Sequence, residues 1–250
     1  KNEFKLTAAE LEAAITPKTK ILVLPFPNNP TGSIMTEEDL KPIAELCVKH
    51  DIFVISDEIY SELTYEYPHT SIASLPGMKE RTVLINGFSK AYAMTGWRIG
   101  YTGSSKEIAK MMGSVQSHQT SNPNSIAQKA AVEALTGPQD SVVKMHAEFD
   151  KRRKYMYERI CKMPLVSTIE PMGAFYVFVD ASEVLGKKYK DTVVESVAQM
   201  AEILINDYNT AVVPCADFGF EKHLRLSYAI SIEQIEKGLD RIESFLNDLK

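Results

Sequence analysis

The sequence has few cysteines, no long hydrophobic run and no block of basic residues. Its three cysteines, Cys47, Cys161 and Cys215, lie far apart and without metal-ligand spacing, so neither a disulfide framework nor a metal site is expected. No apolar run reaches the roughly 18 residues of a membrane-spanning helix, so no membrane association is expected. The 28 basic and 33 acidic residues give a net charge of -5, and nucleic acid is therefore not an expected partner. These features indicate a cytoplasmic protein.

What the sequence does contain is typical of a globular protein. Its 250 residues are 44% hydrophobic and 24% charged, which suits one large domain or two modest ones. The first residues, Lys1-Asn2-Glu3-Phe4, include neither an initiator Met nor the features of a signal peptide. The chain is therefore expected to begin in the middle of a protein.

Apolar runs alternate with helical patterns over the first hundred residues. Strands are predicted at 21–24, 52–55, 83–85 and 97–102, and helices at 7–15 and 36–50. Continuous apolar strands separated by helices are typical of a mostly parallel sheet with helices on both faces. Ligands of such α/β sheets bind at the carboxyl ends of the strands.

The second half is richer in helix. Helices are predicted at 126–135, 145–160, 194–204 and 232–249, and strands at 174–179, 211–213 and 224–228. Gly137-Pro138 closes the first of these helices and marks a domain boundary. We therefore expect an α/β domain over residues 1–138 and a smaller α+β domain over residues 139–250.

Polar side chains follow three of the predicted strands. Asn29 follows the first, Asp57 and Tyr60 follow the second, and Ser89-Lys90 follows the third. Taken singly, each has a purely structural interpretation as a turn former, a helix cap or a surface charge. Because parallel strands end at one edge of a sheet, the combination favours a ligand site.

These segments resemble the signature of the class I/II aminotransferases, which are fold-type-I enzymes dependent on pyridoxal 5'-phosphate. The resemblance rests on residues 28–32, 56–60 and 88–101, and continues in order through residues 120–123, 173–176 and 224–229. Within the family, the chain resembles the bacterial subgroup of aspartate and aromatic aminotransferases. The resemblance implies the aspartate aminotransferase fold and a homodimer.

The resemblance assigns the central chemistry to two residues. Lys90 matches the lysine whose amine forms the Schiff base with the cofactor aldehyde, and it then acts as general acid and base. Asp57 matches the carboxylate that keeps the pyridine nitrogen protonated. Both roles are expectations from the family pattern.

Further cofactor contacts follow from the same resemblance. Asn29 and Tyr60 match the two donors to the phenolic oxygen of the cofactor, and Tyr60 is counted with the catalytic residues. Arg98 matches the arginine that grips the phosphate, and Ser89 adds a hydroxyl there. Many relatives have serine at the position of Gly87, so one phosphate contact is lost here or supplied by another group.

Substrate binding is less completely specified. Arg225 matches the residue that binds the substrate α-carboxylate, with Asn29 beside it in the family site. Aspartate-specific members of one subgroup carry an arginine where this chain has Ser117. The preferred donor is thus left open between aspartate and aromatic amino acids, with a 2-oxo acid such as 2-oxoglutarate as acceptor.

An aminotransferase is the leading interpretation, and two alternatives stay open. A C-S lyase uses the same scaffold and differs only in the fate of the carbanion, although Met94-Thr95-Gly96-Trp97-Arg98 favours the aminotransferase. A transcription regulator can use a related domain to sense the cofactor, but it needs a DNA-binding module.

Some features of the family cannot be located in residues 1–28. They are the glycine-rich loop, the ring-stacking aromatic and the partner-subunit tyrosine. We therefore expect a fragment, weak or inactive alone.

Overall fold

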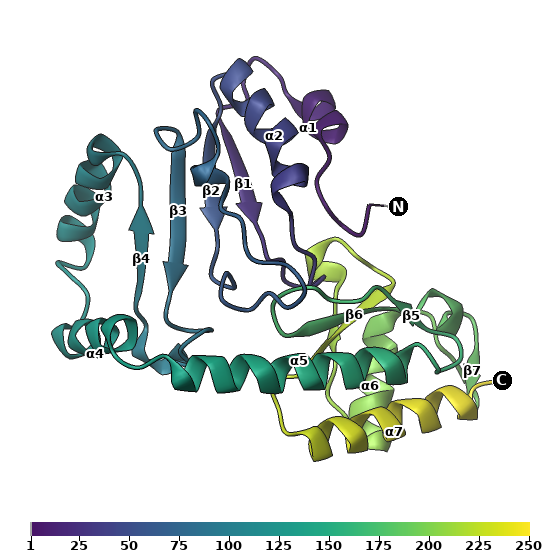
Figure 1. The fold of residues 1–250 in the computed structure, drawn as a ribbon. Helices are drawn as coiled ribbons and strands as arrows, with labels where there is room; N and C mark the ends of the chain where they lie inside the picture. The colour runs from purple at the N-terminus through teal and green to yellow at the C-terminus, as the bar shows by residue number, and fades with distance from the viewer. Residues whose placement is uncertain (1) are drawn as a thin grey trace. The chain divides into compact units, whose positions relative to one another are not determined.

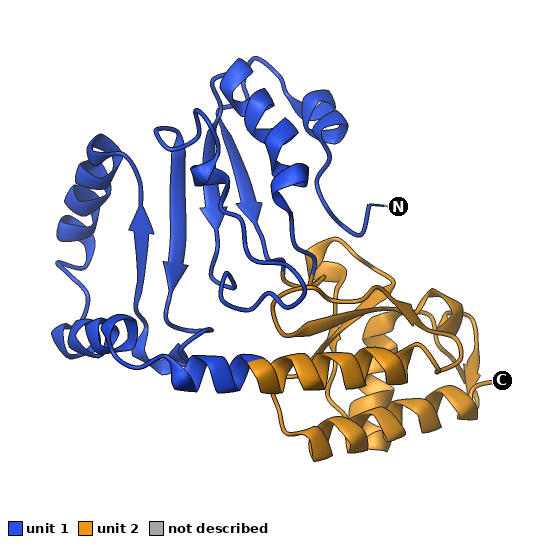
Figure 2. Ribbon diagram, in the orientation of Figure 1, with its two compact units in different colours: residues 1–28, 33–146 blue, residues 29–32, 147–250 orange. Residues whose placement is uncertain are grey.

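The computed structural model describes residues 2–250 as two compact units, which Figure 2 colours separately. The first contains the residues up to Asn28 together with 33–146, and the second contains 29–32 together with 147–250. The sequence places a boundary at 138/139, just before helix α5 (Asp140–Ile160), whereas the units divide inside that helix. A continuous helix carries no local sign of such a division.

The first unit is built on a four-stranded sheet in the order β1-β2-β3-β4 (Figure 1). Its strands are β1 (Ile21–Pro25), β2 (Phe53–Asp57), β3 (Thr82–Gly87) and β4 (Gly100–Gly103). The first three are parallel and β4 is antiparallel, which confirms a mostly parallel sheet. The fourth strand begins later than predicted because Thr95–Trp97 forms a short 3-10 helix, η2.

Four complete α-helices belong to the same unit, together with the beginning of α5. They are α1 (Ala8–Ala14), α2 (Glu37–Lys49), α3 (Lys106–Gln119) and α4 (Ser125–Thr136), and Ile72–Ser74 adds a 3-10 turn, η1. The starts of α1 and α2 are set by capping boxes, in which Thr7 pairs with Glu10 and Thr36 pairs with Asp39. Each box satisfies backbone N–H groups that the first helical turn leaves without a carbonyl partner.

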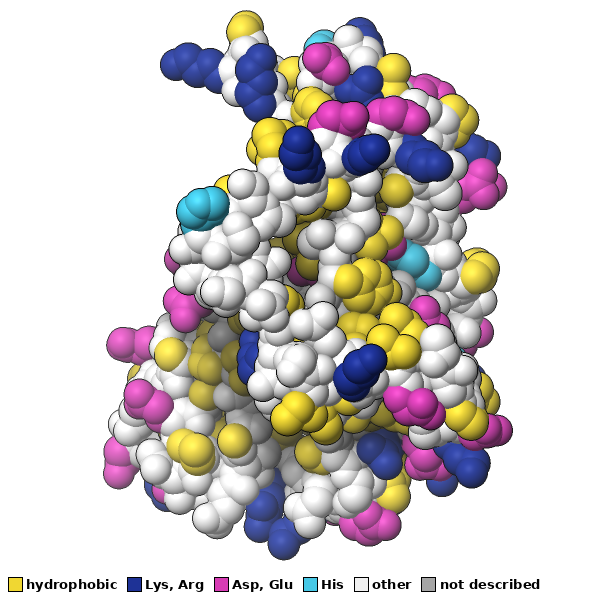
Figure 3. All heavy atoms as spheres, turned by 90° about the vertical axis from the view of Figure 1, so that its left-hand side faces the viewer, with side chains coloured by type: hydrophobic (Ala, Val, Ile, Leu, Met, Phe, Trp, Pro, Cys, Tyr) yellow, Lys and Arg dark blue, Asp and Glu magenta, His cyan; other side chains and the backbone are white. Residues whose placement is uncertain are grey.

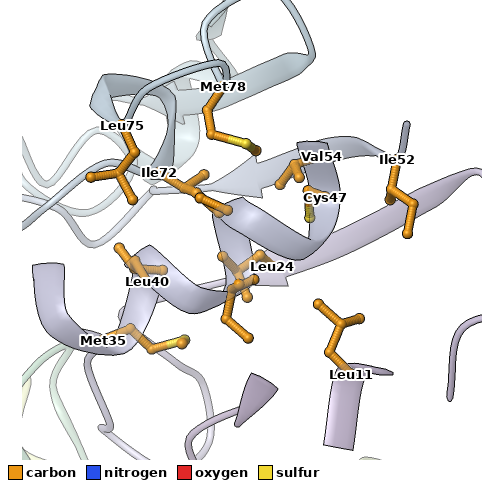
Figure 4. Close-up of a cluster of buried hydrophobic side chains, with 12 residues drawn as sticks. Leu11, Leu24, Met35, Leu40, Cys47, Ile52, Val54, Ile72, Leu75 and Met78 are labelled. Carbon is orange, nitrogen blue, oxygen red and sulfur yellow. The ribbon is translucent and has the colours of Figure 1, made fainter. Parts of the chain in front are cut away.

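The hydrophobic core of this unit lies between α1, α2 and one face of the sheet (Figure 4). Leu24 of β1 and Val54 of β2 point towards Leu40 and Cys47 of α2, and Leu11 of α1 closes the cluster. Neighbouring side chains of a strand point to opposite faces. The alternate positions Ile21, Val23 and Phe53 accordingly lie on the other face, where they are 55%, 60% and 40% exposed.

The second unit is an α+β arrangement, as predicted. Its antiparallel sheet has the order β5-β6-β10-β9, with β5 (Ser167–Thr168), β6 (Tyr176–Asp180), β10 (His223–Ser227) and β9 (Val213–Pro214). The unit also contains the last part of α5 and a two-stranded hairpin of β7 (Lys188–Tyr189) and β8 (Thr192–Val193). Its other elements are the helices α6 (Val197–Tyr208) and α7 (Ile232–Asp248) and the 3-10 turns η3 (Ser182–Val184) and η4 (Ala216–Phe218).

Within residues 2–250, none of the helices is both long enough and apolar enough to cross a membrane. The same residues contain no group of three or more histidine, cysteine or carboxylate side chains placed to hold a metal ion.

Candidate active site

Asp57 and Tyr60 lie in the turn that follows β2. Asp57 is the last residue of β2 and pairs in register with Ile85 of β3. Its Oδ1 accepts a hydrogen bond from the backbone N–H of Ile59 at 3.2 Å, so the carboxylate caps a turn rather than a helix. The turn carries Tyr60 inwards, where it is 5% exposed.

Lys90 follows the neighbouring strand β3 in a tight loop. The backbone N–H of Ala93 donates to the carbonyl of Lys90 at 3.1 Å, and that of Met94 donates to the carbonyl of Phe88 at 3.0 Å. Lys90 Nζ lies 5.5 Å from the centre of the Tyr60 ring, and Ser89 is half-buried in the same loop. The structure therefore brings Lys90 and Tyr60 together beside the strand end that carries Asp57.

Close backbone contact between β3 and β4 explains the glycine at position 87. A Cβ on Gly87 would lie 3.1 Å from the Cα of Gly100, and a Cβ on Gly100 would lie 2.8 Å from the carbonyl oxygen of Asn86. Even a serine at position 87 would therefore force the two strands slightly apart.

Arg98 occupies an exposed turn between η2 and β4. Its backbone is left-handed, with φ of 50°, and its Nη1 donates to the carbonyl of Thr95 at 3.0 Å. A guanidinium has five N–H donors, so one bond to the turn steadies the side chain and leaves it able to bind an anion.

A cluster of polar groups around the buried Glu58, next to Asp57 in the chain, was not predicted from the sequence. Glu58 Oε1 accepts hydrogen bonds from the hydroxyls of Ser56 at 2.9 Å and Ser71 at 2.6 Å, while Oε2 lies 2.7 Å from His69 Nε2. We call these four residues the Glu58 cluster. The only signal in the sequence is a second carboxylate directly after Asp57, and its burial depends on a segment more than ten residues away.

The second unit holds the other two predicted site residues. Nη1 of Arg225, on β10, donates to Oδ1 of Asn29 at 2.7 Å. The guanidinium lies over the rings of Tyr176 and Phe218, with its central carbon 4.6 Å and 5.5 Å from their centres. These two aromatic residues had no predicted role.

The segment that carries Asn29 is anchored within this unit. The backbone N–H groups of Met172 and Gly173 donate to the carbonyl of Gly32 at 2.9 and 2.8 Å. A Cβ on Gly32 would lie 2.6 Å from the Cβ of Pro171, and its φ is +71°. Only glycine accommodates both this backbone conformation and this contact.

Comparison with known proteins identifies the family of this chain. The family described as aminotransferase class I and II matches residues 1–242. The chain is 44% identical to the aspartate aminotransferase of Geobacillus stearothermophilus over 98% of this chain and 62% of that protein. It is 39% identical to aromatic-amino-acid aminotransferase 2 of Thermococcus litoralis over 100% of this chain and 63% of that protein.

Solved structures show the same likeness. The crystal structure of the aspartate aminotransferase from Rhizobium meliloti matches with a TM-score of 0.94 and 38% identity, over 99% of this chain and 63% of that one. The chain thus spans a little under two thirds of the length of the relatives it matches. From its matched family, its fold and its sequence identity, this chain belongs to the class I and II aminotransferases.

Proposed function

We propose that this chain carries the cofactor-binding and carboxylate-binding groups of a pyridoxal 5'-phosphate-dependent aminotransferase. The enzyme moves the amino group of an L-amino acid of the aspartate or aromatic type to a 2-oxo acid such as 2-oxoglutarate. The observation that carries the proposal is the placement of Lys90 Nζ 5.5 Å from the Tyr60 ring, beside the strand end formed by Asp57.

The donor set in the first unit fits the cofactor chemically. It combines a primary amine for the aldehyde, a carboxylate for the pyridine nitrogen, a phenol for the phenolic oxygen and a guanidinium for the phosphate. These groups come from Lys90, Asp57, Tyr60 and Arg98. When bound, the cofactor supplies an electron sink for the bond that breaks at the substrate α-carbon.

Lys90 and Asp57 have complementary tasks in this proposal. The amine of Lys90 anchors the cofactor and then takes the proton from the substrate α-carbon. Asp57 holds a proton on the pyridine nitrogen by pairing with it. Its bond from Ile59 keeps the carboxylate oriented.

The family pattern assigns the two hydrogen-bond donors to the phenolic oxygen of the cofactor to Tyr60 and Asn29. Asn29 Oδ1 already accepts from Arg225, which orients the amide so that its NH₂ group is the end available for donation. Arg98 binds the phosphate with its remaining donors, and Ser89 adds a hydroxyl bond.

Arg225 binds the α-carboxylate of the substrate. A guanidinium forms paired hydrogen bonds with a carboxylate, and the rings of Tyr176 and Phe218 hold its plane in place. The names of the relatives, an aspartate and an aromatic-amino-acid aminotransferase, support both donor classes.

A donor screen with 2-oxoglutarate as acceptor tests the reaction. The protein expressed from its complete gene is expected to form glutamate from aspartate or from an aromatic amino acid. Lys90→Ala is expected to abolish this activity, whereas Lys79→Ala, at an exposed position between η1 and β3, leaves it intact. Release of sulfide and pyruvate from cysteine without amino transfer would instead identify a C-S lyase.

We also propose roles for the two domains and a location for the protein. Residues 1–138 correspond to part of the cofactor domain and 139–250 to the small domain. A cytoplasmic location is supported by the three free cysteine thiols, and cell fractionation tests it.

Homodimer formation is supported by apolar side chains exposed on α3 and α4. Met111, Val115, Ile126, Val132 and Leu135 are 61%, 58%, 71%, 57% and 51% exposed. Figure 3 views this side of the first unit and shows hydrophobic side chains at its surface. Charged substitutions at Ile126 and Val132 are expected to shift the protein to monomer in sedimentation velocity, and an unchanged dimer would place the interface elsewhere.

A further inference from the structure

A buried carboxylate belongs to the turn that carries Asp57 and Tyr60. Glu58 is 3% exposed, and glutamate is rarely buried to this extent without partners. All its partners in the Glu58 cluster are side chains, and none of them has a task in the chemistry proposed above. The cluster therefore needs a separate explanation.

Every polar group of Glu58 forms a hydrogen bond. Its backbone N–H donates to the carbonyl of Ile85 at 2.8 Å, and its carbonyl accepts from the N–H of Ser61 at 2.9 Å. Both carboxylate oxygens are engaged in the cluster. Asp57 precedes Glu58 by one residue and Tyr60 follows it by two, so holding Glu58 limits the movement of both.

The charge of Glu58 is maintained despite its burial. Burial alone raises the pKa of this carboxyl group, but the hydrogen bonds from His69 and Ser71 outweigh that effect, and its pKa lies below the ordinary value. Glu58 is thus ionised at neutral pH. Because an ionised carboxylate only accepts hydrogen bonds, Nε2 of His69 carries a proton and donates it.

We propose that Glu58 is a positioning residue for Asp57 and Tyr60. Its carboxylate is hydrogen-bonded by Ser56 and by His69 and Ser71 of the following segment. These bonds fix the conformation of the turn that contains the carboxylate of Asp57 and the phenol of Tyr60. This inference rests on the proposed cofactor site and adds residues that do not themselves touch the cofactor.

Glu58→Gln is the direct test, because glutamine keeps the size of the side chain but presents an NH₂ group to donors. Glu62→Gln is the matched control, since Glu62 is exposed in the same segment. Both are made in the protein expressed from its complete gene. Two quantities are measured well below the unfolding temperature: the dissociation constant of pyridoxal 5'-phosphate, and the pH midpoint of the absorbance change of the bound cofactor.

In Glu58→Gln, the dissociation constant is expected to rise about tenfold, the equivalent of one hydrogen bond to a charged group. The pH midpoint is expected to move upwards, because a displaced Tyr60 no longer stabilises the phenolate. The midpoint does not depend on how much protein is folded, so a role in stability alone would not move it. Glu62→Gln should match the wild type in both quantities.

If Glu58→Gln does not fold, Ser71→Ala tests the positioning role of Glu58 in its place. It removes a single bond of the cluster, the one at 2.6 Å, and should shift both quantities in the same directions by smaller amounts. The positioning role would be overturned if a folded Glu58→Gln protein had the dissociation constant and the pH midpoint of the wild type. If Glu58→Gln is unfolded, wild-type values of both quantities in Ser71→Ala would overturn it. If the wild type itself shows no saturable cofactor binding, the proposed function is refuted. Failure of the proposed function is therefore distinguishable from failure of the positioning role alone.

Discussion

Two charged side chains are buried among residues 2–250, Glu58 in the first unit and Arg153 in the second. A buried charge is tolerated only when it is paired and hydrogen-bonded. Both satisfy this condition, but by different means: Glu58 is held mainly by hydroxyls and a histidine, whereas Arg153 is held by two carboxylates and a carbonyl.

Arg153 ties α5 to the segment that packs on Gly32. It bonds Asp150 and Glu170 at 2.8 Å and the carbonyl of Pro171 at 3.0 Å. Arg153→Ala leaves these groups without their cation and is expected to lower the free energy of unfolding by about 3–5 kcal/mol. Urea denaturation measures this loss. Lys151→Ala, at an exposed position of the same helix, should change stability by less than about 0.5 kcal/mol, and equal losses would contradict the assignment.

Glu58 makes stability depend on pH in a defined direction. Its pKa in the folded protein lies below the ordinary value of 4.5, so its stabilising contribution is fully present above that pH. The contribution is lost as the pH falls through the folded-state pKa. Glu58→Gln is therefore expected to cost about 1.5–3 kcal/mol at pH 7 and progressively less below pH 4.5. Denaturation series at several pH values measure the trend, and a cost independent of pH would refute it.

At this scale the sequence identified the residues that belong to a motif. Lys90, Asp57 and Arg225 stand in segments that match the family, and the structure places Lys90 beside Tyr60. Glu58 was not identified, because its significance comes from burial against His69 and Ser71. Local sequence does not encode that contact.

At the scale of elements, two glycines are expected to respond to alanine with opposite sign. Gly238 lies inside α7, where an added Cβ meets nothing within 4 Å. Gly238→Ala should stabilise the protein by about 0.5–1 kcal/mol, since alanine loses less backbone entropy in a helix. Gly32→Ala should destabilise it by more than about 1 kcal/mol, because of its positive φ and the contact with Pro171. Thermal unfolding of both variants measures the signs, and a shift of the same sign would refute the argument.

The helices and strands of regular pattern were predictable from the sequence. The α2 and α7 helices and the strands β1 to β3 lie where apolar periodicity and capping signals indicate. The start of β4 was not predictable from the sequence, because η2 and the left-handed backbone of Arg98 interrupt an extended pattern. The division of α5 between two units was also not predictable, since helical periodicity continues through it.

For the whole molecule, the exposed face of β1 and β2 has a consequence for self-association. Ile21, Val23 and Phe53 are 55%, 60% and 40% exposed, and β1 is an edge strand of the sheet. An apolar face next to an open strand edge favours association.

The 250-residue chain is therefore expected to self-associate as its concentration rises, and Val23→Lys should reduce this association. Sedimentation velocity over a range of concentrations measures it. Val143→Lys on α5, where Val143 is 65% exposed, is the matched control. Equal behaviour of the two variants would show that the strand face is not responsible.

The sequence by itself determined the family, the order of the elements and the residues proposed for cofactor chemistry. Motifs, capping boxes and apolar periodicity are local, so they can be read without coordinates. Only the tertiary structure decided that Asn29 bonds Arg225 across 196 positions, that Glu58 is buried and clamped, and that the units divide within α5. Each of these depends on packing between segments distant in the chain, which local residue preferences do not specify.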